Sequence, residues 1–329
     1  MSQAIPPDVY SAIAALRKNV FMFPRFRNAF EQLIQAIELY RATGVASNHL
    51  ILGSSGCGKS TLCKLLVSQY PERREPERNV IPVLYMEIPA LATIKSLVEG
   101  LLSKIGDPAP WAGTISDKTA RLCRLVIGCG VFIAILDEMQ HVRDRGQDLT
   151  VSKAADWIKA FSNSVGCPFA LVGLPRTQYL LDANEQLRRR FSATIFLERF
   201  NMDDPDSVNE FAGVVISFLE GMPLRCSLRP DASIDDLMQF YYATDGRIGY
   251  LASLLSRALL LAHVSGAWTI DQSLLERAFS AEIWYQGVGE LNPFSGHFCG
   301  RSLSEYGEPF YAADLPKKES KSTAIINDL

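Results

Sequence analysis

One short segment, GSSGCGKS at residues 53–60, matches the pattern G-x-x-x-x-G-K-[ST] in full. Glycines in such a turn let backbone N–H groups point inward around phosphate oxygens, and the N-terminus of the following helix adds a favourable dipole. The lysine contacts the β- and γ-phosphates, and the hydroxyl after it ligates Mg²⁺. The segment therefore predicts an ATP-binding loop that consists of Gly53, Ser54, Ser55, Gly56, Cys57, Gly58, Lys59, Ser60 and Thr61.

Two adjacent acids follow the apolar run VFIAIL at residues 131–136. An acid at the carboxyl end of a buried strand lies beside the phosphate loop, so Asp137 is expected to hold Mg²⁺ together with Ser60. The neighbouring Glu138 can orient or polarise the water that attacks the γ-phosphate. The pair thus predicts ATP hydrolysis as well as binding.

Two groups of arginines could also reach a nucleotide. Arg188, Arg189 and Arg190 end a predicted helix, where such residues form either a solvated helix terminus or an arginine finger for a neighbouring subunit. Arg247, in the segment DGR, opens another predicted helix. It could contact the nucleotide or serve as an ordinary helix-terminal charge.

The elements that must position these residues alternate between apolar strands and helical patterns. Strands are expected at residues 49–52, 80–88, 131–136, 168–172 and 193–197, and helices at 59–68, 94–105, 118–127, 154–163 and 177–190. Continuous apolar strands that alternate with helices predict an α/β fold with a five-stranded parallel sheet flanked by helices. From about residue 201 the pattern is helical only, at 207–219, 234–242, 248–263 and 272–285, which predicts a small all-helical lid domain.

These patterns divide the chain into four expected parts. They are an N-terminal helical lead-in segment (1–45), an ATPase domain (46–200), a helical lid (201–288) and a C-terminal extension (289–329), whose last part, 315–329, is expected to be a mobile tail. With 48% hydrophobic and 21% charged residues, the 329-residue chain is typical of a soluble globular protein. Seven cysteines without a C-x-x-C pair argue against a zinc site, and the absence of a long apolar run favours a cytoplasmic location.

The order of phosphate loop, acid-ended strand, arginine cluster and glycine–arginine lid helix resembles the AAA+ ATPases, in the branch of the initiators and clamp loaders. The segments LDEMQH, LVGLPRT and EQLRRRF are similar to the TniB/TnsC family of ATP-dependent regulators of DNA transposition. The resemblance covers about residues 20–285. It implies that Arg190, or else Arg189, acts in trans and that Arg247 lies in the sensor-2 region. One departure is Gly173-Leu174, where many relatives carry a polar sensor-1 residue, so either Thr177 substitutes or γ-phosphate sensing is weak.

The same resemblance implies a homo-oligomeric ring or filament of roughly six to seven subunits on duplex DNA. Such an assembly connects a target-selecting protein to the transposase, and a slow, regulatory hydrolysis of ATP drives its disassembly. A pore around DNA needs residues that touch phosphates without reading bases. The candidates, each also readable as a solvated surface residue, are Thr93, Lys95, Lys118, Arg121, Arg124, Arg143 and Arg145.

Three other functions fit parts of the sequence. A replication initiator or loader of the same superfamily would share the chemistry but act on a different client. A nucleotide-gated interaction module would bind ATP with little turnover, in keeping with the apolar sensor-1 position. A small-molecule kinase is disfavoured because it needs neither the arginine cluster nor a helical lid of this length.

Overall fold

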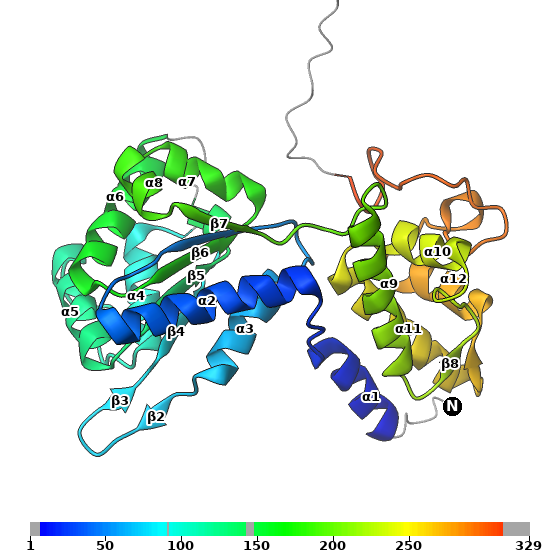
Figure 1. Cartoon of the computed structure of the whole chain (residues 1–329), viewed down its shortest axis with the longest axis horizontal. Helices are drawn as coiled ribbons and strands as arrows, with labels where there is room; N and C mark the ends of the chain where they lie inside the picture. The colour runs from blue at the N-terminus through cyan, green and yellow to red at the C-terminus, as the bar shows by residue number, and fades with distance from the viewer. Residues whose placement is uncertain (1–6, 91, 143–147, 312–329) are drawn as a thin grey trace, which may run out of the picture.

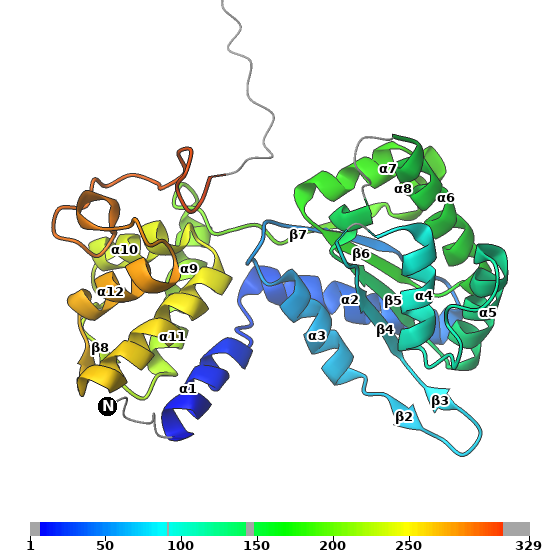
Figure 2. The same cartoon turned by 180° about the vertical axis from the view of Figure 1, so that it is seen from behind.

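The protein consists of an α/β body and a helical lid, joined by an extended connection after the last strand of the sheet (Figures 1 and 2). The structure is a computed structural model that describes residues 7–90, 92–142 and 148–311. The change from strands to helices falls between Phe196 and Pro205. The domain boundaries expected at residues 45, 200 and 288 stay predictions.

The body contains the predicted five-stranded parallel sheet, in the order β4-β5-β6-β1-β7. Its strands are β1 (His49–Leu52), β4 (Val83–Glu87), β5 (Ile133–Asp137), β6 (Phe169–Gly173) and β7 (Ala193–Phe196). Every residue of β1, β5 and β6 is buried, because helices cover both faces of the sheet. All five strands were predicted, and the α/β fold class is confirmed.

Helices cover both faces of the sheet, and successive side chains of each strand point to opposite faces. On one face, α2 (Pro24–Thr43) and α3 (Lys59–Gln69) lie against a core that includes Ile51, Ile135 and Val172. On the other face, Leu50 and Leu136 belong to a core shared with α4 (Ile94–Lys104), α5 (Ile115–Gly128) and α6 (Asp148–Val165). The two faces are visible on either side of the strands in Figure 2.

Two predicted elements differ from the structure, each for a local reason. The strand expected at 80–88 is interrupted at Pro82, which lacks a backbone N–H for the sheet. As a result, β3 (Asn79–Val80) pairs instead with β2 (Arg73–Arg74) in a separate antiparallel hairpin. The helix expected at 177–190 is broken into a 3₁₀ turn (Pro175–Gln178), α7 (Tyr179–Asp182) and α8 (Glu185–Arg190), because extended Asn184 caps α8 through the N–H of Leu187.

The lid contains α9 (Pro205–Glu220), α10 (Ile234–Thr244), α11 (Ile248–Ser265) and α12 (Gln272–Glu282). The all-helical expectation needs one correction, because β8 (Arg225–Cys226) and β9 (Thr269–Ile270) form a short parallel pair beside these helices. The N-terminal helix α1 (Pro7–Lys18) also joins the lid core, and it lies along α11 in both views.

The segment after α12 is not an extended tail throughout. A short 3₁₀ turn (Gly289–Leu291) is followed by Leu303 and Phe310, which are both buried in the lid core. The tail predicted at residues 315–329 lies outside the described residues.

By length and hydropathy, α11 could span a membrane. In this fold it is the central helix of the lid, and most of its leucines and alanines are buried against α1, α10 and α12, which accounts for its apolar composition.

Candidate nucleotide site

The phosphate loop connects β1 to α3 and is closed off by the ends of two neighbouring strands. The N–H of Gly53 donates to the carbonyl oxygen of Gly173 at 3.2 Å. A Cβ at position 53 would collide with the carbonyl of Leu197, so the first residue of the loop must be glycine. Gly56 and Gly58 have φ values of 79° and 94°, a region that other residues rarely adopt. The glycine spacing in the sequence therefore reflects real backbone constraints.

Lys59 begins α3 and is held inside the loop. Its Nζ donates to the carbonyl oxygens of Gly53 at 2.8 Å and Ser54 at 2.9 Å, and only 5% of the residue is exposed. Burial lowers the pKa of the Lys59 ammonium group below its ordinary value, and nearby groups, with Cys57 first, oppose this effect. These two hydrogen bonds fix the Lys59 ammonium group, a hydrogen-bond donor, inside the loop where phosphate oxygens would bind.

The Asp137 carboxylate joins the phosphate loop to the sheet. The hydroxyl of Ser60 donates to Asp137 Oδ2 at 2.6 Å, and the N–H of Glu138 donates to Oδ1 at 2.8 Å. The phenol of Tyr85 also donates to Oδ2, at 3.0 Å. Asp137 is fully buried, so these donors take the place of water around its charge.

Tyr85 is a site residue that the sequence analysis missed. It lies on β4, in register with Ile135 of β5, and Asp137 is two residues further along the same face. Burial, followed by the charge of Asp137, raises the pKa of the Tyr85 phenol far above its ordinary value. The signal in the sequence was a tyrosine in the mostly apolar strand VLYME, and the sheet register shows which residue it faces.

The donor set fits ATP with Mg²⁺. The backbone N–H groups of the glycine-rich loop and the buried ammonium group of Lys59 are suitable donors to phosphate oxygens. Ser60 and Asp137 place two oxygen atoms close together, and Mg²⁺ prefers oxygen ligands. When bound, the ion would neutralise charge that develops on the phosphates. The residues that would hold it are the two that the sequence predicted, and the structure brings them together.

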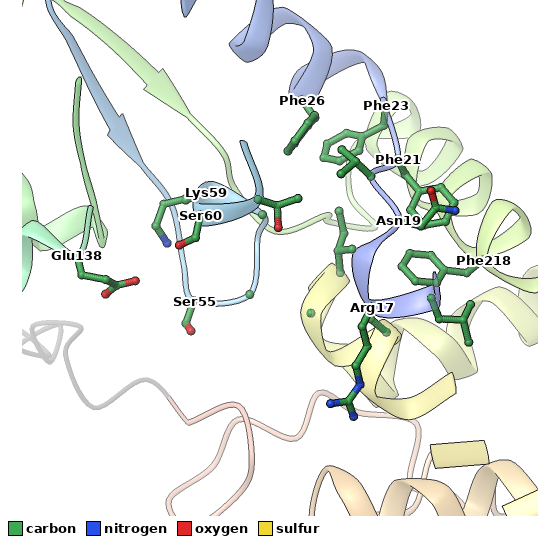
Figure 3. Close-up of a pocket in the computed structure, with 18 residues that line it drawn as sticks. Arg17, Asn19, Phe21, Phe23, Phe26, Ser55, Lys59, Ser60, Glu138 and Phe218 are labelled. Carbon is green, nitrogen blue, oxygen red and sulfur yellow. The ribbon is translucent and has the colours of Figure 1, made fainter. Parts of the chain in front are cut away.

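Glu138 has an unusual backbone, with φ of 59° in a non-glycine residue. Such conformations cost of order 1–3 kcal/mol and cluster at active sites. Its side chain lines the same cavity as Lys59 and Ser60, and Figure 3 shows its carboxylate directed toward the side on which they lie. It accepts a hydrogen bond from the side chain of Gln140. The carboxylate therefore faces the cavity that Lys59 and Ser60 also line.

The cavity, of about 260 Å³, lies where the body, the lid and the N-terminal segment meet (Figure 3). The N–H of Gly249 at the start of α11 donates to the carbonyl of Gly56 at 2.9 Å, so the lid docks directly on the phosphate loop. The segment between α1 and α2 forms the opposite wall with Asn19, Phe21 and Phe23. Sequence reasoning missed this wall, although the aromatic residues in FMFPRF were a visible signal.

Arg247 lies beside the phosphate loop, but its guanidinium group is engaged elsewhere. Its Cβ would be 3.7 Å from a Cβ built on Gly56, while Nη2 lies 3.0 Å from Asp245 Oδ2. Asp245 is buried and also pairs with Arg199, and the Phe310 ring lies 5.9 Å from the Arg247 guanidinium. A nucleotide contact by Arg247 stays a prediction that would require this cluster to rearrange.

The arginine cluster is exposed at the end of α8, as either interpretation requires. Arg189 pairs with Glu185 at 2.6 Å on the same helix. The carbonyl of Arg190 accepts a hydrogen bond from Asn48 at 3.3 Å, and the Asn48 carbonyl oxygen in turn accepts from the N–H of Phe169. The backbone of Arg190 is thereby anchored to the sheet while its side chain faces outward. A role in trans stays a prediction.

The structure corrects one of the predicted DNA-contacting residues, Lys118, and places a second, Arg121, in an ion pair. Lys118 is 1% exposed and pairs with Glu99, while Arg121 pairs with Asp107 and donates to the carbonyl of Ala109 at 3.0 Å. Both side chains thus connect α5 to the segments around α4. Lys118 is enclosed there, whereas a phosphate contact by Arg121, whose side chain is 27% exposed, stays a prediction. The remaining described candidates, all exposed, are Thr93 (which caps α4), Lys95 and Arg124. Arg143 and Arg145 lie outside the described residues.

Comparison with solved structures identifies the fold. The ORC2 protein of Aeropyrum pernix (ADPNP–ADP complexes) is similar with a TM-score of 0.60 and 15% identity, over 81% of this chain and 71% of that one. Cdc6p from Pyrobaculum aerophilum gives 0.59 and 14%, over 84% and 71%. The Aeropyrum pernix ORC1 protein in complex with DNA gives 0.60 and 14%, over 82% and 68%. At this identity the likeness shows a shared AAA+ α/β fold.

Sequence comparison gives the family. A search of curated protein sequences returns no match. The family model described as bacterial TniB protein matches residues 12–202, which span the phosphate loop, the acid pair and the arginine cluster. This match covers more than half of the chain and agrees with the order of motifs at the site; the chain therefore belongs to the TniB family of AAA+ proteins.

Proposed function

We propose that this protein is an ATP-dependent regulator of DNA transposition that assembles on duplex DNA with ATP and leaves it after hydrolysis. The observation that carries the proposal is the cavity lined by Lys59, Ser60 and Glu138 under a docked lid, with buried Asp137 bonded to Ser60 beside it. Ser60 and Asp137 are separated by 77 positions in the chain but their oxygens lie 2.6 Å apart. The TniB family match supports the choice of transposition over other uses of this site.

The roles proposed for the chain's own residues follow from their geometry. The N–H groups of the phosphate loop and Lys59 bind and orient the phosphates, and Ser60 with Asp137 holds Mg²⁺. Glu138 orients the attacking water, and the lid and the aromatic wall exclude bulk solvent. Exposed Arg190 is the proposed finger for a neighbouring subunit. Turnover is expected to be slow, because nucleotide state serves as the assembly switch.

The proposed partners are duplex DNA, further copies of this chain, a transposase and a target-selecting protein, all in the cytoplasm. Exposed Lys95 and Arg124 support backbone contacts to DNA that do not depend on sequence. Such contacts make binding fall steeply with salt, and similarly for unrelated duplexes. The TniB family match supports this part of the proposal as well.

The decisive experiment combines turnover and imaging. Purified protein is incubated with ATP, Mg²⁺ and a duplex of arbitrary sequence, phosphate release is measured, and the sample is examined by electron microscopy. Rings or filaments on DNA with ATP, and their loss after hydrolysis, are expected. Glu138→Gln should keep nucleotide binding, slow hydrolysis and trap the assembled state. Normal turnover in this variant would show that Glu138 does not position the water.

A replication initiator or loader is the alternative that one observation favours, namely the fold similarity to ORC and Cdc6 proteins over about four-fifths of the chain. The two functions differ in client. Stimulation of strand transfer by an integrase-like transposase would support transposition. Recruitment of a replicative helicase without any effect on transposase would favour the alternative.

A further inference from the structure

The carboxylate of Glu138 is hydrogen-bonded to the side chain of Gln140, two residues later in the chain. Gln140 lies in the 3₁₀ turn Met139–Val142 and is only 6% exposed. Its Nε2 donates to Glu138 Oε2, while its Oε1 accepts from the N–H of Leu174 at 3.1 Å. One carboxamide therefore bridges the acid after β5 to the residue that follows β6.

The end of β6 is shaped to accept this carboxamide. A Cβ at Gly173 would lie 2.7 Å from Gln140 Oε1 and would also collide with the hydroxyl of Thr177. Any side chain at position 173 would therefore displace Gln140. Thr177, in the 3₁₀ turn after this strand, is fully buried, and its hydroxyl has no hydrogen-bond partner within the described part of the chain. It is enclosed behind Gly173 and does not face the cavity.

We infer that Gln140 is a positioning residue for ATP hydrolysis: its carboxamide anchors the Glu138 carboxylate to β6 and holds it facing the cavity. This inference rests on the proposed hydrolytic function. It explains why the strand end can lack a polar side chain, since Gln140 supplies the polar group from a different segment. A carboxylate offers about four lone-pair sites, so one bond to Gln140 leaves acceptor capacity for a water.

The kinetic test uses Gln140→Leu, which keeps the bulk of the side chain but removes both hydrogen bonds. A loosened Glu138 should lower kcat about ten-fold or more, while KM for ATP stays within about two-fold. The matched control is Gln32→Leu on α2, which also loses a side-chain bond, to Asn28 at 3.2 Å, but does not line the cavity. In a Glu138→Gln background, Gln140→Leu should cause no further loss, because the two residues act as one unit.

A second test needs neither nucleotide nor turnover. At neutral pH, Gln140→Glu keeps an acceptor for the N–H of Leu174 but opposes two carboxylates, so the unfolding midpoint of the nucleotide-free protein should fall by at least about 2 °C. The exchanged pair, Glu138→Gln with Gln140→Glu, restores a donor and an acceptor. It should recover the midpoint but not the turnover.

The outcomes separate this inference from the proposed function. Wild-type protein without ATP turnover would overturn the proposed hydrolysis and the inference with it. Active wild-type protein combined with a Gln140→Leu kcat within two-fold of normal would overturn the positioning role alone. The same holds for a loss in Gln140→Leu that persists undiminished in the Glu138→Gln background. Failure of the exchanged pair to recover stability would show that the two side chains do not form the proposed bond.

Discussion

The phenol of Tyr85 offers the sharpest test of the proposed metal site. Tyr85→Phe removes one oxygen and leaves the ring in place between β4 and α3. In the present structure Asp137 Oδ2 accepts from Ser60 at 2.6 Å and from Tyr85 at 3.0 Å. Because Ser60 is itself proposed to bind Mg²⁺, Tyr85 is the side chain left to orient Oδ2 once the ion is present. The raised pKa of the phenol keeps it protonated and able to donate at any pH suited to the assay.

The size of the effect follows from the burial of the acceptor. Asp137 is fully buried, and a hydrogen bond to a charged acceptor contributes about 1.5–3 kcal/mol. At 1.4 kcal/mol for each factor of ten, this corresponds to roughly a ten-fold to hundred-fold loss of Mg²⁺ affinity. Substitution of residues that hydrogen-bond to metal ligands typically lowers metal affinity by a similar factor. Nucleotide binding measured without Mg²⁺ should change little.

The assay is a Mg²⁺ titration of ATP turnover at saturating ATP, together with nucleotide binding in the presence of a chelator. Tyr306→Phe is the matched control, because this tyrosine is 90% exposed and loses the same atom. A Tyr85→Phe variant with the Mg²⁺ dependence of wild-type protein would refute the reasoning. It would show that Asp137 keeps its orientation without the phenol, or that it is not a ligand of the ion.

Four further variants test other parts of the protein. Lys59→Ala should weaken nucleotide binding and ATP-dependent assembly, measured with a fluorescent nucleotide and by light scattering; assembly at the normal ATP concentration would count against the loop assignment. Arg190→Ala should abolish turnover in trans, with partial recovery on mixing with Lys59→Ala subunits; no recovery would point to Arg189. In urea unfolding, Glu99→Gln should lower the free energy of unfolding because it removes the negative charge opposite the buried ammonium group of Lys118. Lys118→Met should cost less, since the Glu99 side chain is 28% exposed, and it should leave DNA affinity unchanged; the reverse order of stabilities would contradict the buried pair.

Features carried by consecutive residues were predictable from the sequence. The phosphate loop depends on a fixed spacing of glycines and one lysine, and its flanking strand and helix are adjacent in the chain. Asp137 and Glu138 were identified because an acid after a buried parallel strand must emerge at the same sheet edge as the loop. The five strands and most helices followed from periodicity, which is a local property.

Two predicted elements were wrong in their extent because a single residue interrupts each of them. Pro82 divides a predicted strand, and Asn184 divides a predicted helix by capping its second half. Both residues were visible in the sequence. The apolar pattern around them was continuous, however, and periodicity alone does not show where the backbone hydrogen bonds change partner.

The sequence by itself thus predicted the family, the fold class and the residues that are proposed to hold the phosphates and Mg²⁺. The tertiary structure decided which side chains support them: Tyr85 from a neighbouring strand, and Gln140 through its bridge to Leu174. It also removed Lys118 from the candidate DNA surface, because this side chain is buried in the fold, whereas from sequence a lysine is expected to be exposed to solvent. The physical reason is the same in each case. Burial and hydrogen-bond partners depend on segments that are distant in the chain, and only packing of the complete fold brings those segments together.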